Sequence, residues 1–294
     1  MGGRGYKPDV ASINMFETRE ESLMSEIFRL NDYLARIGVE GPLRADLATL
    51  TKLQAAHVAA LPFEGLDPLL RRPVALDLAA LQAKIVDGRR GGYCYEQNAI
   101  FAAALDALGF EVTRLGARVR WMSPPDAPLG PRTHMLLKVD LDGIAYLADV
   151  GFGACLLEAP LRLEIGAEQR TAMGTYRLTD GEGHYTLSAQ RPDGWRAMYA
   201  FNLEPQLAAD YELGNYFTST HPQAPFPNVL IMERLLADQR LKLVNLRLIA
   251  EARDGRVVSE RTIASAEDLA DVLDQTFQIT PPVPAAEIFA RISG

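Results

Sequence analysis

The sequence predicts an α+β protein in which a helical first third, an antiparallel β middle third and a small mixed α/β unit follow one another. Three observations predict this order. Apolar residues recur at helical spacing up to about residue 110, alternate through most of the next hundred residues, and form paired strand patterns with one capped helix near the end. The expected segments are 1–17, 18–110, 111–205, 206–229 and 230–294.

The first third contains several predicted helices, each preceded by a residue or pattern that can start it. Residues 1–17 show no period, so we expect a poorly ordered extension there. Thr18 opens a capping-box pattern, and Asp46 and Asp77 can accept hydrogen bonds from the first turns of the next two helices. The last of these helices follows two glycines and carries an apolar face. The predicted helices cover residues 18–37, 47–60, 78–86 and 94–108.

The middle third is predicted to be an antiparallel sheet or barrel. Its apolar residues alternate, as Leu115, Ala117 and Val119 do on one face of a strand, and short glycine-containing turns join neighbouring strands. The segment 122–132 is rich in proline, which cannot donate to a strand ladder, so we expect a loop there. The other predicted strands lie within residues 133–150, 176–188 and 195–201.

The last third is predicted to be a mixed α/β unit behind a connecting segment. A helix is expected over residues 207–217, and a hydroxyl-rich loop over 218–222. Strand patterns continue on both sides of a turn at 254–255, and Ser265 can cap a final helix that reaches residue 277. The predicted strands here cover residues 241–252 and 257–263.

Composition and charge exclude several classes of function. The 294 residues are 48% apolar and 23% charged with a net charge of −8, which is typical of a globular protein and argues against a nucleic-acid-binding surface. The two cysteines, Cys94 and Cys155, are too few for a disulfide framework and follow no zinc-binding pattern, so we expect no metal and a reducing compartment. No signal peptide, myristoylation motif or bilayer-length apolar run is present, so we expect a cytoplasmic protein without membrane attachment. Monomer and homodimer both stay open.

Cys94 is the residue on which the predicted chemistry depends. It lies in the first turn of the predicted 94–108 helix, directly after Gly91, Gly92 and Tyr93. The unpaired N–H groups and the dipole of a helix start favour a thiolate, and the two glycines let another molecule approach the backbone. A lone cysteine is more often a small buried hydrophobe, so the nucleophile hypothesis needs partners elsewhere in the chain.

His134 and Asp149 are the predicted partners of Cys94. A thiol nucleophile needs a base to take its proton, and the base needs a third group to orient it. Of the four histidines, His134 begins a strand directly after the proline-rich loop, and Asp149 ends the next strand. A tight hairpin places the two on neighbouring strands, close enough for the carboxylate to orient the imidazole.

The segments around Cys94, His134 and Asp149, in this order and at these separations along the chain, resemble those of the arylamine N-acetyltransferases. The resemblance implies three domains of the cysteine-proteinase-like kind: an N-terminal helical bundle, an antiparallel β-barrel and a C-terminal α/β lid. It implies that Cys94 takes acetyl from acetyl-coenzyme A as a thioester, that His134 is the acid and base, and that Asp149 orients His134. The acceptor is then an arylamine, arylhydrazine or N-hydroxyarylamine, and the cycle is ping-pong. The segments that carry the likeness are 90–98, 133–134 and 149–153, with agreement also at 33–38, 57–64, 218–222 and Phe226.

The resemblance also implies residues of the two substrate sites. Phe63, Val119 and Phe152 match residues of the acceptor pocket, and their apolar side chains suit an aromatic ring, although a purely structural role in the core suits them as well. Backbone N–H groups near Cys94 would meet the tetrahedral oxyanion. The positions implied to lie along coenzyme A are Gly130, Gly153, Ser219 and Thr220.

Two positions depart from the family pattern. Gly65 follows Pro-Phe-Glu where the family commonly has Asn, and Ala224 stands where a hydroxyl is frequent, so coenzyme binding or the shape of the cleft is expected to differ. Glu64 and Arg90 are predicted to pair and to tie the helical bundle to the nucleophile loop.

Other functions stay open on the sequence alone. A relative that transfers a larger acyl thioester or closes a macrolactam uses the same triad, because the triad is indifferent to the acyl group. A proteinase or transglutaminase does too, but the likeness outside the triad argues against both. A non-catalytic binding relative is a further alternative, against which the presence of all three triad residues argues.

Overall fold

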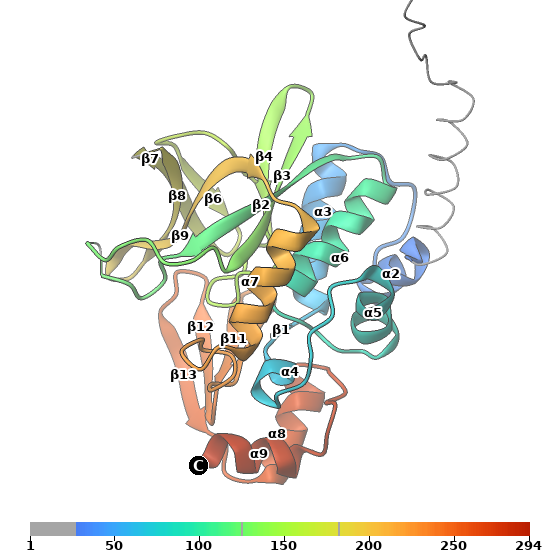
Figure 1. Cartoon of the computed structure of the whole chain (residues 1–294), viewed down its shortest axis with the longest axis vertical. Helices are drawn as coiled ribbons and strands as arrows, with labels where there is room; N and C mark the ends of the chain where they lie inside the picture. The colour runs from blue at the N-terminus through green and yellow to red at the C-terminus, as the bar shows by residue number, and fades with distance from the viewer. Residues whose placement is uncertain (1–27, 125, 182) are drawn as a thin grey trace, which may run out of the picture.

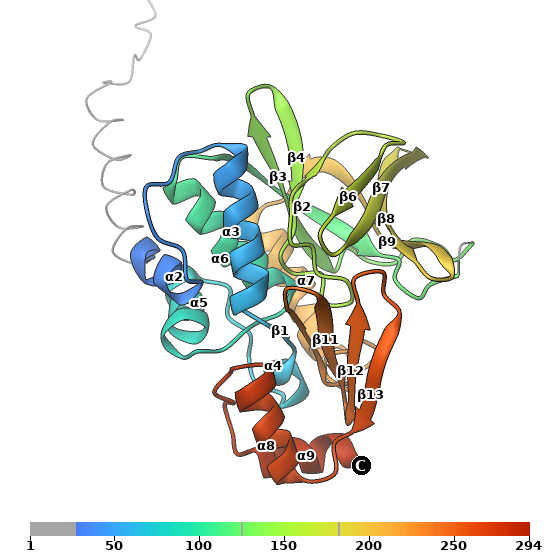
Figure 2. The same cartoon turned by 180° about the vertical axis from the view of Figure 1, so that it is seen from behind.

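The computed structural model of the chain describes residues 28–124, 126–181 and 183–294. Helices gather on one side of the molecule and a large curled sheet on the other, while a smaller sheet with two helices lies below both (Figure 1). The view from behind shows the same three groups, with α3 in front of α6 (Figure 2). The predicted α+β architecture is confirmed.

Three helices of the first third, α3, α5 and α6, begin where the sequence predicts, whereas residues 28–29 are not helical and α2 begins only at Leu30, so the prediction of one helix through 18–37 is wrong there. Asp46 accepts a hydrogen bond from the N–H of Thr49 at 2.8 Å, and Asp77 accepts one from Ala80 at 2.9 Å. The predicted cap at Thr18 lies outside the described residues. The 78–86 helix continues as a π-helical turn, η1, instead of a regular helix. The bounds are α2 Leu30–Arg36, α3 Leu47–Ala60, α4 Leu66–Leu69, α5 Leu78–Leu81, η1 Gln82–Asp87 and α6 Cys94–Ala107.

The middle third forms an antiparallel sheet that curls into a nearly closed barrel. Within the described residues its strand order is β5-β4-β3-β2-β9-β8-β7-β6, and the tight hairpin predicted between the strands of His134 and Asp149 turns at Asp142 and Gly143, between β3 and β4. The described part of the proline-rich segment contains no strand, as expected. The bounds are β2 Glu111–Val119, β3 His134–Leu141, β4 Ile144–Ala148, β5 Leu161–Arg162, β6 Glu168–Thr171, β7 Gly174–Gly181, β8 His184–Arg191 and β9 Gly194–Pro205.

The connecting helix is longer than predicted. α7 spans Ala208–Thr220, so the hydroxyl-rich residues 218–220 form its last turn, and the predicted loop there is wrong. Ser219 and Thr220 donate their hydroxyls to the carbonyls of Asn215 and Tyr216, at 2.7 and 2.5 Å. This bonding to the carbonyl four residues earlier lets hydroxyl side chains stay in a helix.

Residues 230–294, predicted to be the lid domain and called by that name below, contain most of a second antiparallel sheet. The predicted strand at 241–252 is wrong because it is two strands, which turn at Asn245 with a φ of 49°, a conformation that Asn tolerates. Ser265 caps α8 as predicted, with its hydroxyl 3.2 Å from the N–H of Asp268. The sequence did not predict β10 or α9. The bounds are β10 Ile231–Leu235, β11 Gln239–Val244, β12 Arg247–Ala252, β13 Val257–Thr262, α8 Ala266–Asp271, η2 Val272–Thr276 and α9 Ala285–Ser293.

A short strand from the helical part completes the sheet of the lid domain. β1, Phe63–Glu64, pairs antiparallel with β10, so the sheet order is β1-β10-β11-β12-β13. Gly92, two residues before Cys94, forms a bridge with Phe63 on the other side. The lid domain is therefore joined by backbone hydrogen bonds to the segment that carries the nucleophile.

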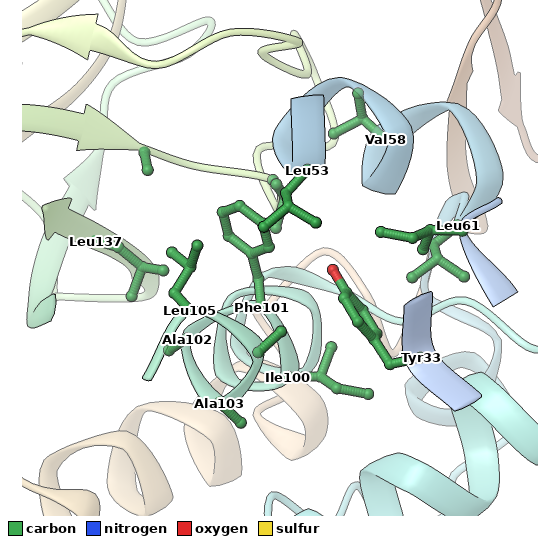
Figure 3. Close-up of a cluster of buried hydrophobic side chains, with 14 of the residues drawn as sticks. Tyr33, Leu53, Val58, Leu61, Ile100, Phe101, Ala102, Ala103, Leu105 and Leu137 are labelled. Atoms are coloured by element: carbon green, nitrogen blue, oxygen red, sulfur yellow. The ribbon is translucent and has the colours of Figure 1, made fainter. Parts of the chain in front are cut away.

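Apolar packing fixes α6 between α3 and the barrel. Phe101 and Leu105 of α6 pack with Leu53 of α3, and Leu137 of β3 lies on the other side of Leu105 (Figure 3). All four side chains are fully buried, and each contributes on the order of 1.5–3 kcal/mol through burial. The helix that begins at Cys94 is thus anchored along its length.

Among the described residues, no helix has both the length and the apolar character needed to cross a bilayer.

Candidate active site

Cys94 is the first residue of α6, and the backbone before it is held by a side chain of the same helix. The Glu96 carboxylate accepts a hydrogen bond from the N–H of Tyr93 at 3.1 Å. Its Oε1 also forms an ion pair with Nζ of Lys84, at 2.6 Å. A side chain on Gly91 would overlap the carbonyl oxygen of Pro62, and one on Gly92 would lie 2.8 Å from Cβ of Glu96. The glycines thus admit the protein's own backbone, which corrects the expectation that they leave room for another molecule.

The structure brings His134 and Asp149 together beside Cys94. Nε2 of His134 donates to Oδ2 of Asp149 at 2.7 Å, and Cys94 lies near enough to the imidazole to help raise its pKa. The Cys94 sulfur lies 3.6 Å from the carbonyl oxygen of Thr133, the residue before His134. His134 is 3% exposed and Asp149 is 0% exposed. His134 is therefore hydrogen-bonded to Asp149 inside the protein, and Cys94 and His134 line the same cavity.

The electrostatics of this chain favour charge on both His134 and Asp149. Burial by itself lowers the pKa of His134, but the Asp149 carboxylate and Cys94 outweigh it and raise the pKa to about 10. Burial raises the pKa of Asp149, but His134, Asn98 and the N–H of Gly151 together hold it below its ordinary value. His134 is thus an imidazolium at neutral pH, balanced by the carboxylate.

Asn98 connects the three segments that supply these residues. It lies one helical turn after Cys94, and its amide donates to Oδ1 of Asp149 at 3.0 Å and to the carbonyl of Met135, the neighbour of His134, at 2.7 Å. Its oxygen accepts from the N–H of Val150 at 3.1 Å. One feature of the sequence could have indicated this role of Asn98. Residues four apart share a helix face, so Asn98 lies on the same face of the helix as Cys94.

A cavity of about 540 Å³ opens at Cys94 and His134, and the predicted acceptor residues Phe63, Val119 and Phe152 all line it. Phe63 and Phe152 are buried, whereas Val119 is 38% exposed. The Phe152 ring meets that of His134 edge-on, with ring centres 5.2 Å apart. Trp121 and Thr218, which a loop and the end of α7 bring in, also line the cavity and were missed by sequence patterns. Ala224, expected to affect the cleft, and Phe226, part of the family likeness, line it too.

The four residues predicted along coenzyme A are placed differently from one another. Gly153 lines the cavity at Cys94, and Gly130 is exposed on the loop next to Pro131, which also lines it. Ser219 and Thr220 instead line a neighbouring cavity of about 890 Å³ on the other side of α7. The structure therefore does not bring these two hydroxyls to Cys94.

Glu64 and Arg90 pair as the sequence predicts. Nε of Arg90 donates to Oε1 of Glu64 at 2.7 Å, and its Nη2 lies 3.2 Å from Oδ2 of Asp67. The second carboxylate oxygen of Glu64 accepts from the N–H of Leu66. Because Glu64 belongs to β1 and Arg90 to the nucleophile loop, the pair joins these two segments.

Among residues 28–124, 126–181 and 183–294, no three His, Cys, Asp or Glu side chains gather where they could hold a metal ion.

Comparison with known proteins identifies the family. Residues 46–284 match the N-acetyltransferase family. The chain is 44% identical to an arylamine N-acetyltransferase of Mycolicibacterium smegmatis, over 84% of this chain and 90% of the relative, and 37% identical to an arylamine N-acetyltransferase / N-hydroxyarylamine O-acetyltransferase of Salmonella typhimurium, over 84% and 88%. It superposes on the solved structure of Mycobacterium marinum arylamine N-acetyltransferase in complex with CoA with a TM-score of 0.85 and 39% identity, covering 90% of this chain and 98% of that one. The chain therefore belongs to the arylamine N-acetyltransferase family of acetyl-transferring enzymes.

Proposed function

We propose that this enzyme transfers acetyl from acetyl-coenzyme A to arylamines, arylhydrazines or N-hydroxyarylamines in two half-reactions through a thioester on Cys94. One observation carries the proposal: His134 lies between Cys94 and Asp149 at the wall of a cavity lined with aromatic side chains. A thiol, a base and an orienting carboxylate are the groups that acyl transfer through a cysteine requires.

In the first half-reaction, His134 holds the proton of Cys94, so that the sulfur attacks the thioester carbonyl of acetyl-coenzyme A as a thiolate. The tetrahedral oxyanion forms at the start of α6, where the helix dipole and backbone N–H groups stabilise negative charge. When the intermediate collapses, the bond to the sulfur of coenzyme A breaks. His134 gives its proton to that sulfur, and the acetyl group remains on Cys94.

In the second half-reaction, His134 is neutral and acts as the base. An aromatic amine enters the cavity, and its nitrogen attacks the acetyl carbonyl while His134 takes the proton from that nitrogen. The bond to Sγ of Cys94 then breaks, the amide is released, and the imidazolium–thiolate pair is restored. Asp149 keeps Nε2 of His134 occupied throughout, so the other ring nitrogen does the proton transfer.

The walls of the cavity support an aromatic acceptor. We propose that Phe63, Val119 and Phe152 hold its ring, because flat apolar walls suit one. Coenzyme A is proposed to reach Cys94 past Gly153 and past Gly130 at the end of the proline-rich loop. The same role for Ser219 and Thr220 requires their hydroxyls to leave the carbonyls of α7. The two unpaired cysteines support a cytoplasmic location.

Intact mass spectrometry after incubation with acetyl-coenzyme A tests the proposal. We expect the wild-type protein to gain one acetyl group and to lose it when an arylamine is added. Cys94→Ser is expected to gain none, whereas Cys155→Ala serves as the matched control and should behave as wild type. An acetyl group that persists in Cys94→Ser contradicts the thioester, and a protein that never gains one contradicts the function.

A further inference from the structure

Phe226 forms part of the wall of the catalytic cavity, and its ring rests on Gly65. A Cβ atom at position 65 would lie 2.9 Å from Cδ1 of Phe226, well inside the carbon–carbon contact distance of about 3.5–4.0 Å. The backbone does not require glycine here, because Gly65 has a φ of −111°, which other residues adopt. What glycine supplies at this position is the space that the Phe226 ring occupies.

The other neighbours of the Phe226 ring leave it little room to move. The Tyr93 ring meets it edge-on with centres 5.4 Å apart, and the Phe63 ring lies 5.8 Å away. Both are buried, and Phe63 cannot retreat because its ring already lies against Gly153, where any side chain would overlap it. The partly buried Phe226 also lines the cavity. A side chain at position 65 therefore pushes the ring toward the space beside Cys94.

A second small residue, Ala224, also affects the size of the catalytic cavity. It lines the cavity two residues before Phe226 and is 5% exposed. A longer side chain there would also take up space in the cavity. The small residues Gly65 and Ala224 thus both leave more space in the cavity, Gly65 through Phe226 and Ala224 directly.

We infer that Gly65 is a specificity-determining residue. Because it has no side chain, the Phe226 ring packs against it and leaves space in the cavity, which can then bind amines larger than one aromatic ring. The substrates it favours are fused-ring or para-extended aryl amines and hydrazines. This inference rests on the proposed function, because it concerns the second half-reaction of that cycle. Gly65 acts through Phe226 and needs no contact with the acceptor itself.

The test measures transfer from preformed acetyl-enzyme to aniline and to 2-aminofluorene, whose fused rings need the extra space. In Gly65→Ala we expect the ratio of kcat/KM for 2-aminofluorene over aniline to fall about tenfold, since one misplaced carbon in an apolar pocket discriminates by roughly that factor. Gly65→Asn should lower the ratio further. Gly65→Ala combined with Phe226→Leu should return it to within about threefold of wild type, because the shorter side chain gives back the space.

The matched control is Gly181→Ala, where an added methyl group meets no atom within 4 Å, and its ratio should stay at the wild-type value. If wild type forms no acetyl-enzyme, the proposed function and this inference both fail. If acetyl-enzyme forms but the ratio is unchanged in Gly65→Ala, or both acceptors lose rate equally, the inference alone fails. A double variant that does not recover the ratio also overturns it, because the effect would then bypass Phe226.

Discussion

His57 in the helical bundle and His134 in the active site are both buried, yet they have opposite charge states. His57 receives the hydroxyl of Tyr33 on Nδ1 at 2.7 Å and donates Nε2–H to the amide oxygen of Gln97 at 2.8 Å. With two neutral partners, burial dominates and lowers its pKa to about 3. Burial acts on His134 in the same direction, but Asp149 and Cys94 outweigh it and raise the pKa to about 10.

The comparison shows that depth alone does not make a histidine a proton carrier. A fully buried ring without an ionised neighbour stays neutral and serves as a structural hydrogen-bonding group. The same ring beside a carboxylate keeps its proton and can pass it to sulfur. The difference between the two regions thus lies in their neighbours: Asp149 and Cys94 raise the pKa of His134, whereas burial and Arg36 lower that of His57.

Removing the negative charge of Asp149 should have the largest effect. In Asp149→Asn the buried imidazolium loses its counter-charge and the amide can hold the wrong tautomer, so the rate of acetyl-enzyme formation should fall by about 10³-fold or more. Rapid-quench mass spectrometry measures this rate. The exposed pair partner Asp193 gives the control, since Asp193→Asn should leave the rate unchanged. A loss below about tenfold would show that His134 does not depend on Asp149.

Adding a charge to the other histidine should make it resemble the first. In Gln97→Glu a carboxylate replaces the amide 2.8 Å from Nε2 of His57, so the pKa of His57 should rise by about two units or more from its value of about 3. Nuclear magnetic resonance titration of the ring measures it. Gln97→Met removes the acceptor without adding charge and should leave the pKa low. An unchanged pKa in Gln97→Glu contradicts the role given to the neighbour's charge.

Loosening Asp149 without removing it should cost less. Asn98→Ala deletes the amide that holds Oδ1 of Asp149 and the carbonyl after His134, so acetyl-enzyme formation should slow by about 10- to 50-fold through misplacement of the reacting groups. Its pH profile should also shift, because the carboxylate loses a hydrogen bond that lowers its pKa. Equal slowing at every pH would indicate that Asn98 only supports the fold.

A further effect is expected on the pH dependence of stability, with opposite signs for the two histidines. The pKa of His57 falls from 6.5 to about 3 on folding, so its stabilisation is present above pH 6.5 and is lost on acidification by about 1.4 kcal/mol per pH unit. The pKa of His134 rises from 6.5 to about 10, so its stabilisation is present below pH 6.5 and is lost as pH rises toward 10. Urea unfolding should show a flatter acid limb in His57→Gln and a flatter alkaline limb in Asp149→Asn. Unchanged slopes in both variants would contradict these assignments.

The sequence predicted those parts of the site that depend on local pattern. The caps at Asp46 and Asp77 and the positions of Cys94, His134 and Asp149 follow from residue type and from the ends of helices and strands. These features require only a few neighbouring residues to be interpreted correctly.

What the sequence could not supply depends on tertiary contacts. Residues 218–220 are expected to form a loop because hydroxyl residues favour loops, but they extend α7. The hydroxyls of Ser219 and Thr220 bond back to its carbonyls, and these two residues line the neighbouring cavity. The roles of Asn98 and of Gly65 depend on side chains more than 50 residues away in the chain, such as Asp149 and Phe226. The charge states of His57 and His134 likewise follow from neighbours that packing brings together.

The edge strand β1 also has a consequence for protein engineering. Because residues 63–64 complete the sheet formed by β10 to β13, the C-terminal 65 residues do not contain the whole sheet and are not a self-contained structural unit. A fragment cut at residue 230 would present β10 as an open edge, which invites pairing with other chains. Chimaeras between relatives should therefore exchange the Pro-Phe-Glu segment together with the C-terminal portion, so that both halves of this seam come from one parent.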